Sequence, residues 1–296
     1  MLSLTLAIPF FNQLHDAKGP LGLLKYNTSK TTEWMIIDNG STDPVEEFMR
    51  KYLKPKRLNY IRNQENLGLV KTYQQIYENC QTDILAILHN DVFVYEKNWD
   101  KRVISKFEEI PDLGGIGFFG AQGCGPIGER VQKVQHSGQM SGLSNMLEAE
   151  VHGLRMTEEY KPAAIFDGFA MIFRMEMLKK AGGIDQRYHY HHIYDRDIPL
   201  TSLSLGYKNI ILNVPCHHWS GMTANRPEYQ NWIAQKLARP VGKADKWTHD
   251  TNSHLFAAKW KDCLPLYVND DFSFRTEPYL NHQFKGDAIQ KLRHQS

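Results

Sequence analysis

The chain has 296 residues, of which 42% are hydrophobic and 23% are charged, a composition typical of a folded protein of one or two domains. This composition excludes disorder, collagen and coiled coil as descriptions of the whole chain. The 35 Lys and Arg residues nearly cancel the 33 Asp and Glu residues, which leaves a net charge of +2. We therefore predict no broad basic surface and no nucleic-acid partner.

The cysteines and the apolar runs indicate the compartment. The four cysteines lie far apart and form no Cys-x-x-Cys pair, so neither a zinc ribbon nor a disulfide scaffold is predicted. The first residues alternate like a strand and lack the pattern of a signal peptide. No apolar run approaches the roughly 20 residues that span a bilayer. The sequence thus predicts a cytoplasmic protein without a transmembrane segment, in which any membrane contact is peripheral.

Short apolar runs alternate with amphipathic stretches through the first half of the chain. Helices are predicted over about 44–53 and after Asn66, where Leu67, Val70 and Tyr77 recur at helical spacing. Strands are predicted near 3–9, 34–38, 58–61, 84–88 and 114–119. This alternation is typical of an α/β protein with a mainly parallel sheet flanked by helices.

The second half is less regular. Residues 120–160 are rich in Gly, Gln, Ser and His with weak periodicity, which predicts irregular loops or an inserted flap. An apolar block over 163–173 leads into a short helix that ends at Gly182-Gly183. After an apolar run over 209–214, residues 222–296 are polar with scattered aromatic residues. We predict that this part is helical in places.

Polar residues follow the first two predicted strands directly, at the sheet edge where ligands of open α/β proteins bind. Pro9-Phe10-Phe11-Asn12 follows the first strand and Asp38-Asn39-Gly40-Ser41-Thr42-Asp43 the second. An aromatic ring here could stack on a nucleotide base while Asp38 accepts a hydrogen bond from base or ribose. The second segment is also a common turn and helix-cap sequence, and taken alone that interpretation is favoured.

Three further segments offer charged or metal-binding groups. His89-Asn90-Asp91 follows the buried run at 84–88 and could hold a divalent cation on a diphosphate or simply form a turn. Three histidines and two carboxylates lie between His189 and Asp197, and His217 and His218 follow Cys216. Their spacing matches no zinc signature, so no dedicated zinc site is predicted. A carboxylate such as Asp195 is better suited to act as a general base.

Taken in order, these segments resemble the glycosyltransferases of family 2, which have the GT-A fold. The resemblance covers roughly residues 3–221 and rests on the following motifs: Ala7-Ile-Pro-Phe-Phe-Asn12, Ile36-Ile-Asp-Asn-Gly-Ser-Thr-Asp43, Glu65-Asn-Leu-Gly68, His89-Asn-Asp91, Phe166-Asp-Gly168, Gly182-Gly-Ile-Asp185 and Tyr194-Asp-Arg-Asp197. Each motif is short, but their order is specific and favours the functional interpretation of each segment over the turn interpretation.

The resemblance implies a donor site and a metal site. By similarity to the family, the residues that hold the nucleotide-sugar donor are Pro9, Phe11, Asn12, Asp38, Asn39, His89, Asn90 and Asp91. The last acid of an Asp-x-Asp motif, here Asp91, places a Mn²⁺ or Mg²⁺ ion on the donor diphosphate. A histidine after the last strand often completes the metal shell in relatives, a position matched by His217 or His218.

The resemblance also implies a catalytic base and an acceptor side. The internal acid of the family's Glu-Asp-x-Asp motif is the base, which here is Asp195. Asp167 and Gly168 would position acceptor hydroxyls, and we add Asp197 and Trp219 as acceptor contacts. Trp219 could stack on a sugar ring or pack into a core; most other aromatic residues of the last third are predicted to be core.

Three positions depart from the family pattern. His89 replaces the first acid of Asp-x-Asp, so less charge faces the metal, and His89 itself could bind ribose or the ion. Tyr194 replaces the usual Glu before the base, and Thr201 stands where relatives often carry Arg. These departures affect stabilisation of the leaving group, whereas Asp91 and Asp195 are both retained.

The sequence therefore predicts an inverting, metal-dependent glycosyltransferase with a GT-A catalytic domain at 1–221 and an extension at 222–296 on the acceptor side. The donor class is a nucleotide-diphosphate sugar, with UDP-sugar favoured by resemblance. The acceptor class is a glycan or a lipid-linked or protein-linked sugar. Two alternatives stay open: a nucleotidyltransferase, although its glycine-rich basic loop is absent, and a non-catalytic carbohydrate-binding protein of the same fold.

Overall fold

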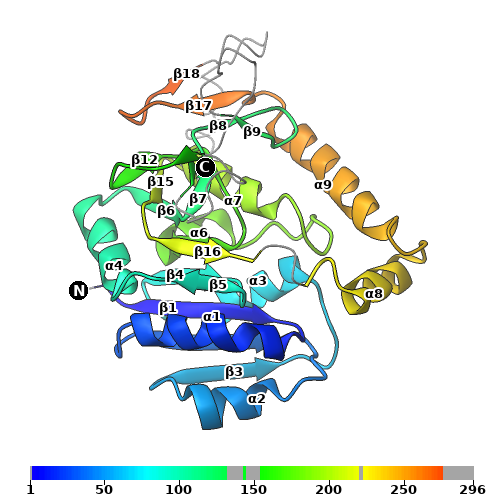
Figure 1. The fold of residues 1–296 in the computed structure, drawn as a ribbon. Helices are drawn as coiled ribbons and strands as arrows, with labels where there is room; N and C mark the ends of the chain where they lie inside the picture. The colour runs from blue at the N-terminus through cyan, green and yellow to red at the C-terminus, as the bar shows by residue number, and fades with distance from the viewer. Residues whose placement is uncertain (1, 132–142, 145–153, 220–222, 276–296) are drawn as a thin grey trace.

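The structure, a computed structural model, describes residues 2–131, 143–144, 154–219 and 223–275. Its helices are α1 Leu14–Asn27, α2 Val45–Glu47, α3 Leu69–Asn79, α4 Trp99–Glu109, α6 Met175–Ala181, α7 Tyr194–Ser204, α8 Pro227–Leu237 and α9 Ala244–Trp260, with a π-helical segment η1 at Phe48–Leu53. Figure 1 shows how they surround a central sheet.

The central sheet has eight strands in the order β12-β15-β6-β14-β4-β1-β2-β3. Their bounds are β1 Leu4–Phe10, β2 Glu33–Asp38, β3 Leu58–Arg62, β4 Ile84–Leu88, β6 Leu113–Gly117, β12 Tyr160–Pro162, β14 Ala170–Arg174 and β15 Lys208–Leu212. Strands β3, β2, β1 and β4 pair in parallel, as do β6 and β15, whereas β14 and β12 are antiparallel to their neighbours. The predicted mainly parallel α/β sheet is confirmed.

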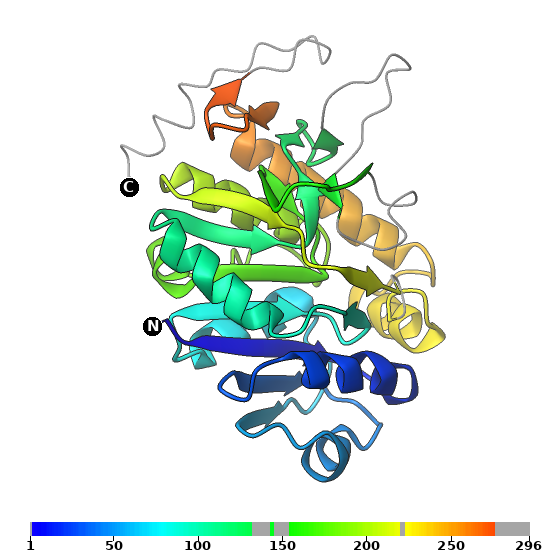
Figure 2. The same ribbon diagram turned by 60° about the vertical axis from the view of Figure 1, so that its left-hand side comes forward.

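The inner strands β1, β4 and β6 are buried on both faces because they are apolar on both sides, as parallel strands usually are. In β4, Leu85 and Ile87 join one hydrophobic core, whereas Ile84, Ala86 and Leu88 join the other. Helices α1 and α4 pack on the second core, and helices α3, α6, α7 and α9 pack on the first. The two layers of helices are visible on either side of the sheet in Figure 2.

The five predicted strands all form, at β1, β2, β3, β4 and β6, and the helix predicted after Asn66 is α3. The segment at 44–53 is only briefly α-helical before it becomes π-helical as η1. Helix α1 was not predicted, since Gly19, Pro20 and Gly22 interrupt its sequence; Pro20 and Leu21 are nevertheless buried against the sheet.

Short strands form where the sequence predicts irregular loops at 120–160. The bounds of the remaining strands are β5 Val92–Val94, β7 Phe119–Ala121, β8 Gly123–Cys124, β9 Arg130–Val131, β10 Leu143–Ser144, β11 Leu154–Arg155, β13 Ile165–Phe166, β16 Cys216–His218, β17 Leu266–Val268 and β18 Phe274–Arg275. They belong to three small sheets. Of the two predicted alternatives, irregular loops do not describe these parts, because short strands form there, while 132–142 and 145–153 lie outside the described residues.

The C-terminal segment packs back against the first part of the chain. Strand β17 pairs with β8, and helix α9 contributes Phe256 and Trp260 to the first hydrophobic core. Figure 1 shows α8 and α9 along one side of the molecule, with β17 and β18 at the end near β8 and β9. The extension is thus packed on the sheet domain and lies next to the cavity described below.

Candidate active site

A cavity of about 320 Å³ opens at the carboxyl ends of the parallel strands, the edge at which open α/β sheets bind ligands. Its walls come from strand ends in the first half of the chain and from α7, α8 and the segments before them in the second half. The lining residues are Pro9, Phe10, Phe11, Asn39, Asn66, Gly68, Leu69, His89, Asn90, Asp91, Arg130, Asp167, Gly168, His191, His192, Tyr194, Asp195, Arg196, His218, Thr223, Ala224 and Tyr229.

Most of the predicted donor-binding residues line this cavity: Pro9, Phe11, Asn39, His89, Asn90 and Asp91. Asn12 instead joins two loops, because its side-chain oxygen accepts a hydrogen bond from the Thr42 N–H at 2.8 Å and its own N–H donates to Ser41 Oγ at 2.8 Å. The adjacent strands β1 and β2 hold these loops side by side. Asn12 therefore shapes the rim and does not line the cavity.

Asp38 is fully buried at the end of β2 and its carboxylate has three protein partners. Tyr60 Oη and Arg62 Nη1 each donate to it at 2.6 Å, and the Ser41 N–H donates at 2.8 Å. Arg62 also donates to the Ser41 carbonyl at 2.6 Å. The carboxylate thus organises the loop after β2, and the structure does not bring it into the cavity.

His89, Asp91 and His218 form a cluster whose ligand atoms all lie within 4.8 Å of one another. His89 follows β4, Asp91 precedes β5, and the pairing of His218 with Val92 places β16 beside them. Asp91 Oδ1 lies 3.2 Å from Nε2 of His218, yet this buried oxygen has no hydrogen bond of acceptable geometry. A buried carboxylate oxygen without a hydrogen bond, together with two imidazoles, forms a set of ligands that fits a divalent cation.

The environment of this cluster favours a charged carboxylate. Burial acts to raise the pKa of Asp91, but the close approach and charge of His218 hold it below its ordinary value. Burial acts to lower the pKa of His218, and contact with Asp91 outweighs it, so that the pKa is raised. Burial lowers the pKa of His89, which favours the neutral imidazole that a metal ion requires.

Only one of the two histidines of β16 joins the cluster. Successive side chains of a strand point to opposite faces, so His217 points away from Asp91. Its ring lies 6.0 Å from that of Phe93, whereas the ring of His218 stacks on Phe169 at 4.7 Å. The structure therefore selects His218 from the two predicted ligands.

Asp195 lies in the first turn of α7 and faces the same cavity. Its Oδ1 lies 3.3 Å from Nη1 of Arg196. A carboxylate in the first turn is favoured by the helix dipole. Gly168 packs so closely here that an added Cβ would lie 2.8 Å from Tyr194 Oη and 3.4 Å from Asp195 Cβ. The absence of a side chain at this position keeps the approach to Asp195 open.

Asp167 lies beside Gly168 and is paired with Arg130. Its Oδ1 also accepts a hydrogen bond from the Phe169 N–H at 3.3 Å. Burial acts to raise the pKa of Asp167, but the charges of Arg130, His218 and Arg196 hold it below its ordinary value. The carboxylate is thus charged and lines the same cavity as the cluster of His89, Asp91 and His218.

Two predicted acceptor residues do not line the cavity. Asp197 is buried in the core, where Tyr188 Oη, Lys259 Nζ and Trp260 Nε1 donate to its carboxylate at 2.9, 2.8 and 2.8 Å. Trp219 is 43% exposed and packs edge-on against Phe93 at 4.9 Å. Asp197 therefore anchors α7 to α9, and we leave both residues out of the proposed site.

Several lining residues were missed by the sequence analysis: Arg130, Arg196, His191, His192 and Tyr229. Arg196 stands between the two acids of a recognised motif, which was a usable signal. The two histidines were noted only for their density, and Arg130 falls in the segment predicted to be irregular. Nothing in the local sequence of Tyr229 distinguishes it from other aromatic residues of the extension.

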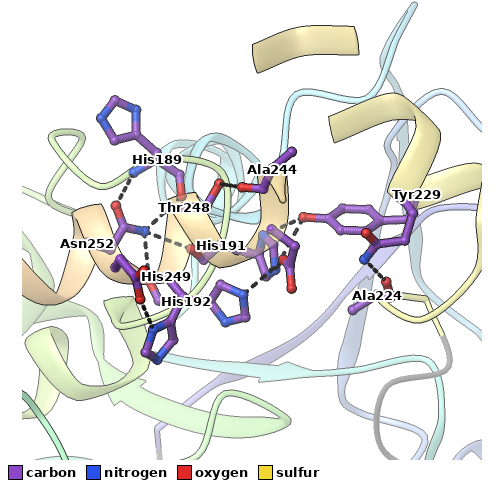
Figure 3. A network of polar contacts seen from close by, with 12 residues as sticks. His189, His191, His192, Ala224, Tyr229, Ala244, Thr248, His249 and Asn252 are labelled. Atoms are coloured by element: carbon purple, nitrogen blue, oxygen red, sulfur yellow. Dashed lines mark hydrogen bonds and ion pairs between the residues drawn. The ribbon is translucent and has the colours of Figure 1, made fainter. Parts of the chain in front are cut away.

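A polar network joins the segment before α7 to the C-terminal helices (Figure 3). Asn252 Nδ2 donates to the carbonyl oxygens of His189, His191 and His192 at 2.9, 2.7 and 3.2 Å, and its Oδ1 accepts from the His189 N–H at 2.8 Å. The Tyr229 hydroxyl contacts Nδ1 of His191. Burial lowers the pKa of His191 to about 4, so the ring is neutral at neutral pH. The extension thereby positions the segment that leads into Asp195.

A mainly parallel sheet with a metal-type cluster and an acid at its carboxyl edge defines the GT-A class of glycosyltransferases. The family model described as glycosyl transferase family 2 matches residues 5–182. The chain belongs to this family. No curated protein sequence matches the chain.

Solved structures show the same fold at low sequence identity. A mannosyltransferase from Pyrobaculum calidifontis, in complex with GDP-Man and Mn²⁺, is 14% identical with a TM-score of 0.53, over 87% of this chain and 73% of that one. GalNAc-T7 with UDP, GalNAc and Mn²⁺ is 14% identical with a TM-score of 0.56, over 88% and 56%. Residues 1–349 of S. aureus TarS are 12% identical with a TM-score of 0.50, over 93% and 96%.

Membrane insertion has no support from the helices described: across residues 2–131, 143–144, 154–219 and 223–275, none combines the length and apolar character that crossing a bilayer requires.

Proposed function

We propose that the protein is an inverting, metal-dependent hexosyltransferase that moves a sugar from a UDP-sugar to a hydroxyl group of a glycan or of a lipid-linked or protein-linked sugar. The observation that carries this proposal is that Asp195 and the cluster His89, Asp91 and His218 line one cavity. One cavity thus offers both a base and ligands for a cation beside a diphosphate.

The proposed reaction uses the residues of this chain in three roles. Asp195 accepts the proton of the acceptor hydroxyl while the hydroxyl oxygen attacks the anomeric carbon of the donor sugar. The bond from that carbon to the diphosphate oxygen breaks at the same time. Attack in line with the leaving group inverts the anomeric centre. Asp167 and Gly168 position the acceptor, while Pro9, Phe11 and Asn39 contact the nucleotide. Asn12 and Asp38 stabilise the loops after β1 and β2 through hydrogen bonds and do not line the cavity.

His89, Asp91 and His218 would hold the cation. A bound Mn²⁺ or Mg²⁺ would neutralise charge on the departing diphosphate. Support comes from the buried Asp91 Oδ1 without a hydrogen bond and from the two glycosyltransferases of similar fold whose structures contain Mn²⁺. His89 supplies a neutral ligand where the family pattern has an acid, so we expect weaker metal binding than with two carboxylates.

We further propose that residues 1–221 form the catalytic domain and that 222–296 form an extension on the acceptor side. Tyr229 of α8 in the cavity wall supports this division. A cytoplasmic location is part of the proposal and is supported by four cysteines that are all buried free thiols.

A panel of nucleotide sugars assayed for slow donor hydrolysis with Mn²⁺ tests the function without knowledge of the acceptor. We expect one UDP-sugar to be hydrolysed and Asp195→Asn to lower this rate about 100-fold or more, because general bases contribute at least that much. Binding of the same donor, measured by calorimetry, should persist in Asp195→Asn. Asp91→Asn or a chelator should instead weaken donor binding.

The matched control is Asp250→Asn, which removes an exposed carboxylate of α9 that lies outside the cavity; its turnover should equal that of the wild type. Equal turnover of Asp195→Asn and wild type would contradict the assigned base. A protein that binds sugars but hydrolyses no donor would favour the non-catalytic alternative.

A further inference from the structure

A second group of metal-binding side chains lies on the cavity wall, separate from the cluster around Asp91. It consists of His191 and His192, which precede α7, and Asp245 in the first turn of α9; we call it the loop–α9 cluster. Its three ligand atoms lie within 4.8 Å of one another. The Nε2 atoms of both histidines approach the same oxygen, Asp245 Oδ1, at 2.7 and 3.1 Å.

The backbone brings these neighbouring histidines to one side. Successive side chains of an extended chain point to opposite sides, yet the two rings here have centroids only 3.7 Å apart. Tyr190, His192 and Ile193 have φ angles of 47°, 72° and 70°, a left-handed conformation that costs roughly 1–2 kcal/mol per residue without a glycine. Such strain persists only where its surroundings enforce it and is concentrated at functional sites.

The contacts around the cluster resemble those of metal-bound histidines. Tyr229 contacts Nδ1 of His191, so Nδ1 can carry the proton and leave the lone pair of Nε2 for an ion. A partner on the second ring nitrogen is nearly universal for metal-ligating histidine. Asn252 donates hydrogen bonds to the carbonyl oxygens of both histidines, at 2.7 and 3.2 Å (Figure 3), and so fixes the backbone that carries the two rings.

The distances suit a small tetrahedral ion. Zinc binds nitrogen and carboxylate oxygen at about 2.0–2.2 Å, which places neighbouring ligand atoms about 3.3 Å apart. The two Nε2 to Oδ1 distances, 2.7 and 3.1 Å, would need to lengthen by about 0.6 and 0.2 Å to reach this separation. Two imidazoles and one carboxylate, without the diphosphate oxygens that the donor would add at the Asp91 cluster, favour Zn²⁺ over Mg²⁺ or Ca²⁺, which prefer oxygen ligands.

We propose that His191, His192 and Asp245 form a zinc site that ties helix α9 to the segment leading into Asp195. The fourth ligand position belongs to water or to a ligand in the cavity, since both histidines line it. Local spacing predicts no zinc site here, because the carboxylate ligand lies 53 positions beyond His192.

Calorimetric titration of tag-free, metal-stripped protein with Zn²⁺ tests this proposal without any sugar substrate. We expect two tight sites in the wild type, one in Asp91→Asn, one in Asp245→Asn and none in the double variant. His192→Asn should lose the same site as Asp245→Asn, with zinc binding there about 100-fold weaker or more. Asparagine tolerates the left-handed backbone at position 192, so the fold should be retained.

His189→Asn is the matched control, because it removes a histidine of the same segment whose ring packs on Trp247 outside the cluster; it should keep both sites. Circular dichroism checks that each variant is folded. Unchanged zinc binding in folded Asp245→Asn and His192→Asn would overturn the proposal and leave the cluster as a hydrogen-bonded clamp. Absence of donor hydrolysis would contradict the proposed function but not this site.

Discussion

Two regions build the cavity by different physical means. Strands β1, β2 and β4 deliver their polar residues from rigid, doubly buried parallel strands, where position follows from the end of each strand. The segment at 189–193 has no regular structure, carries left-handed residues and is held by side chains of α8 and α9. The first region is fixed by strand pairing, whereas the second depends on packing between distant parts of the chain.

Gly68 precedes α3 and packs against Tyr190 of the 189–193 segment. Gly68→Ala should have the largest effect on stability. Its φ is 80° with ψ 162°, a region open essentially to glycine alone, and an added Cβ would lie 2.8 Å from Tyr190 Cα. We expect the free energy of unfolding in urea to fall by about 3 kcal/mol, from backbone strain plus this clash.

Gly182→Ala is the matched control because Gly182 has a φ of 78° but no atom within 4 Å of an added Cβ. It should lose only about 1 kcal/mol, the cost of a left-handed alanine. Equal losses in the two variants would show that contact between the regions contributes nothing.

Asn252→Ala should selectively weaken the second region. Asn252 is fully buried and forms hydrogen bonds with the backbone of the 189–192 segment. Its removal leaves buried polar groups without a hydrogen-bond partner, at a cost of about 2 kcal/mol. Urea unfolding should report this loss, and donor hydrolysis should fall as the segment before Asp195 shifts.

Ser253→Ala provides the comparison, since Ser253 is the next residue of α9 and its buried Oγ has no hydrogen-bond partner. Its stability should stay within about 0.5 kcal/mol of wild type. If Asn252→Ala behaved like Ser253→Ala, the segment would not depend on α9.

Asp185→Asn should have the smallest effect and a defined pH dependence. The hydrogen bond from Arg187 holds the pKa of Asp185 below its ordinary value; burial opposes this and Lys259 adds to it. A lowered folded-state pKa means that the stabilisation is present above about pH 4 and is lost as the pH falls further. We expect a loss of about 1 kcal/mol at pH 7 for this surface-linked network.

Unfolding of Asp185→Asn and wild type, measured in urea between pH 7 and pH 2, checks the sign. The difference between the two proteins should shrink steadily below about pH 4. A constant difference across this range would mean that the ion pairs with Arg187 and Lys259 contribute nothing.

Much of the sheet domain could be predicted because its signals are local. Ile84–Leu88 reads as a buried strand from five consecutive apolar residues, and Asp91 follows it at the sheet edge. Helix α1 was not predicted because Pro20 and two glycines interrupt its helical pattern. Burial against the sheet supplies the stability of this helix. The short strands within 119–131 were not predicted, because they are two or three residues long and depend on pairing with β13 and β17.

The sequence by itself determined the α/β class, the family motifs and the residue types at the cavity, since strand runs and motif order are properties of consecutive residues. Only the tertiary structure decided which of His217 and His218 faces Asp91, that Asp38 and Asp197 serve buried networks, and that Asp245 meets His191 and His192. Side-chain direction depends on strand pairing and backbone φ, and partners far apart in the chain meet only when the elements pack.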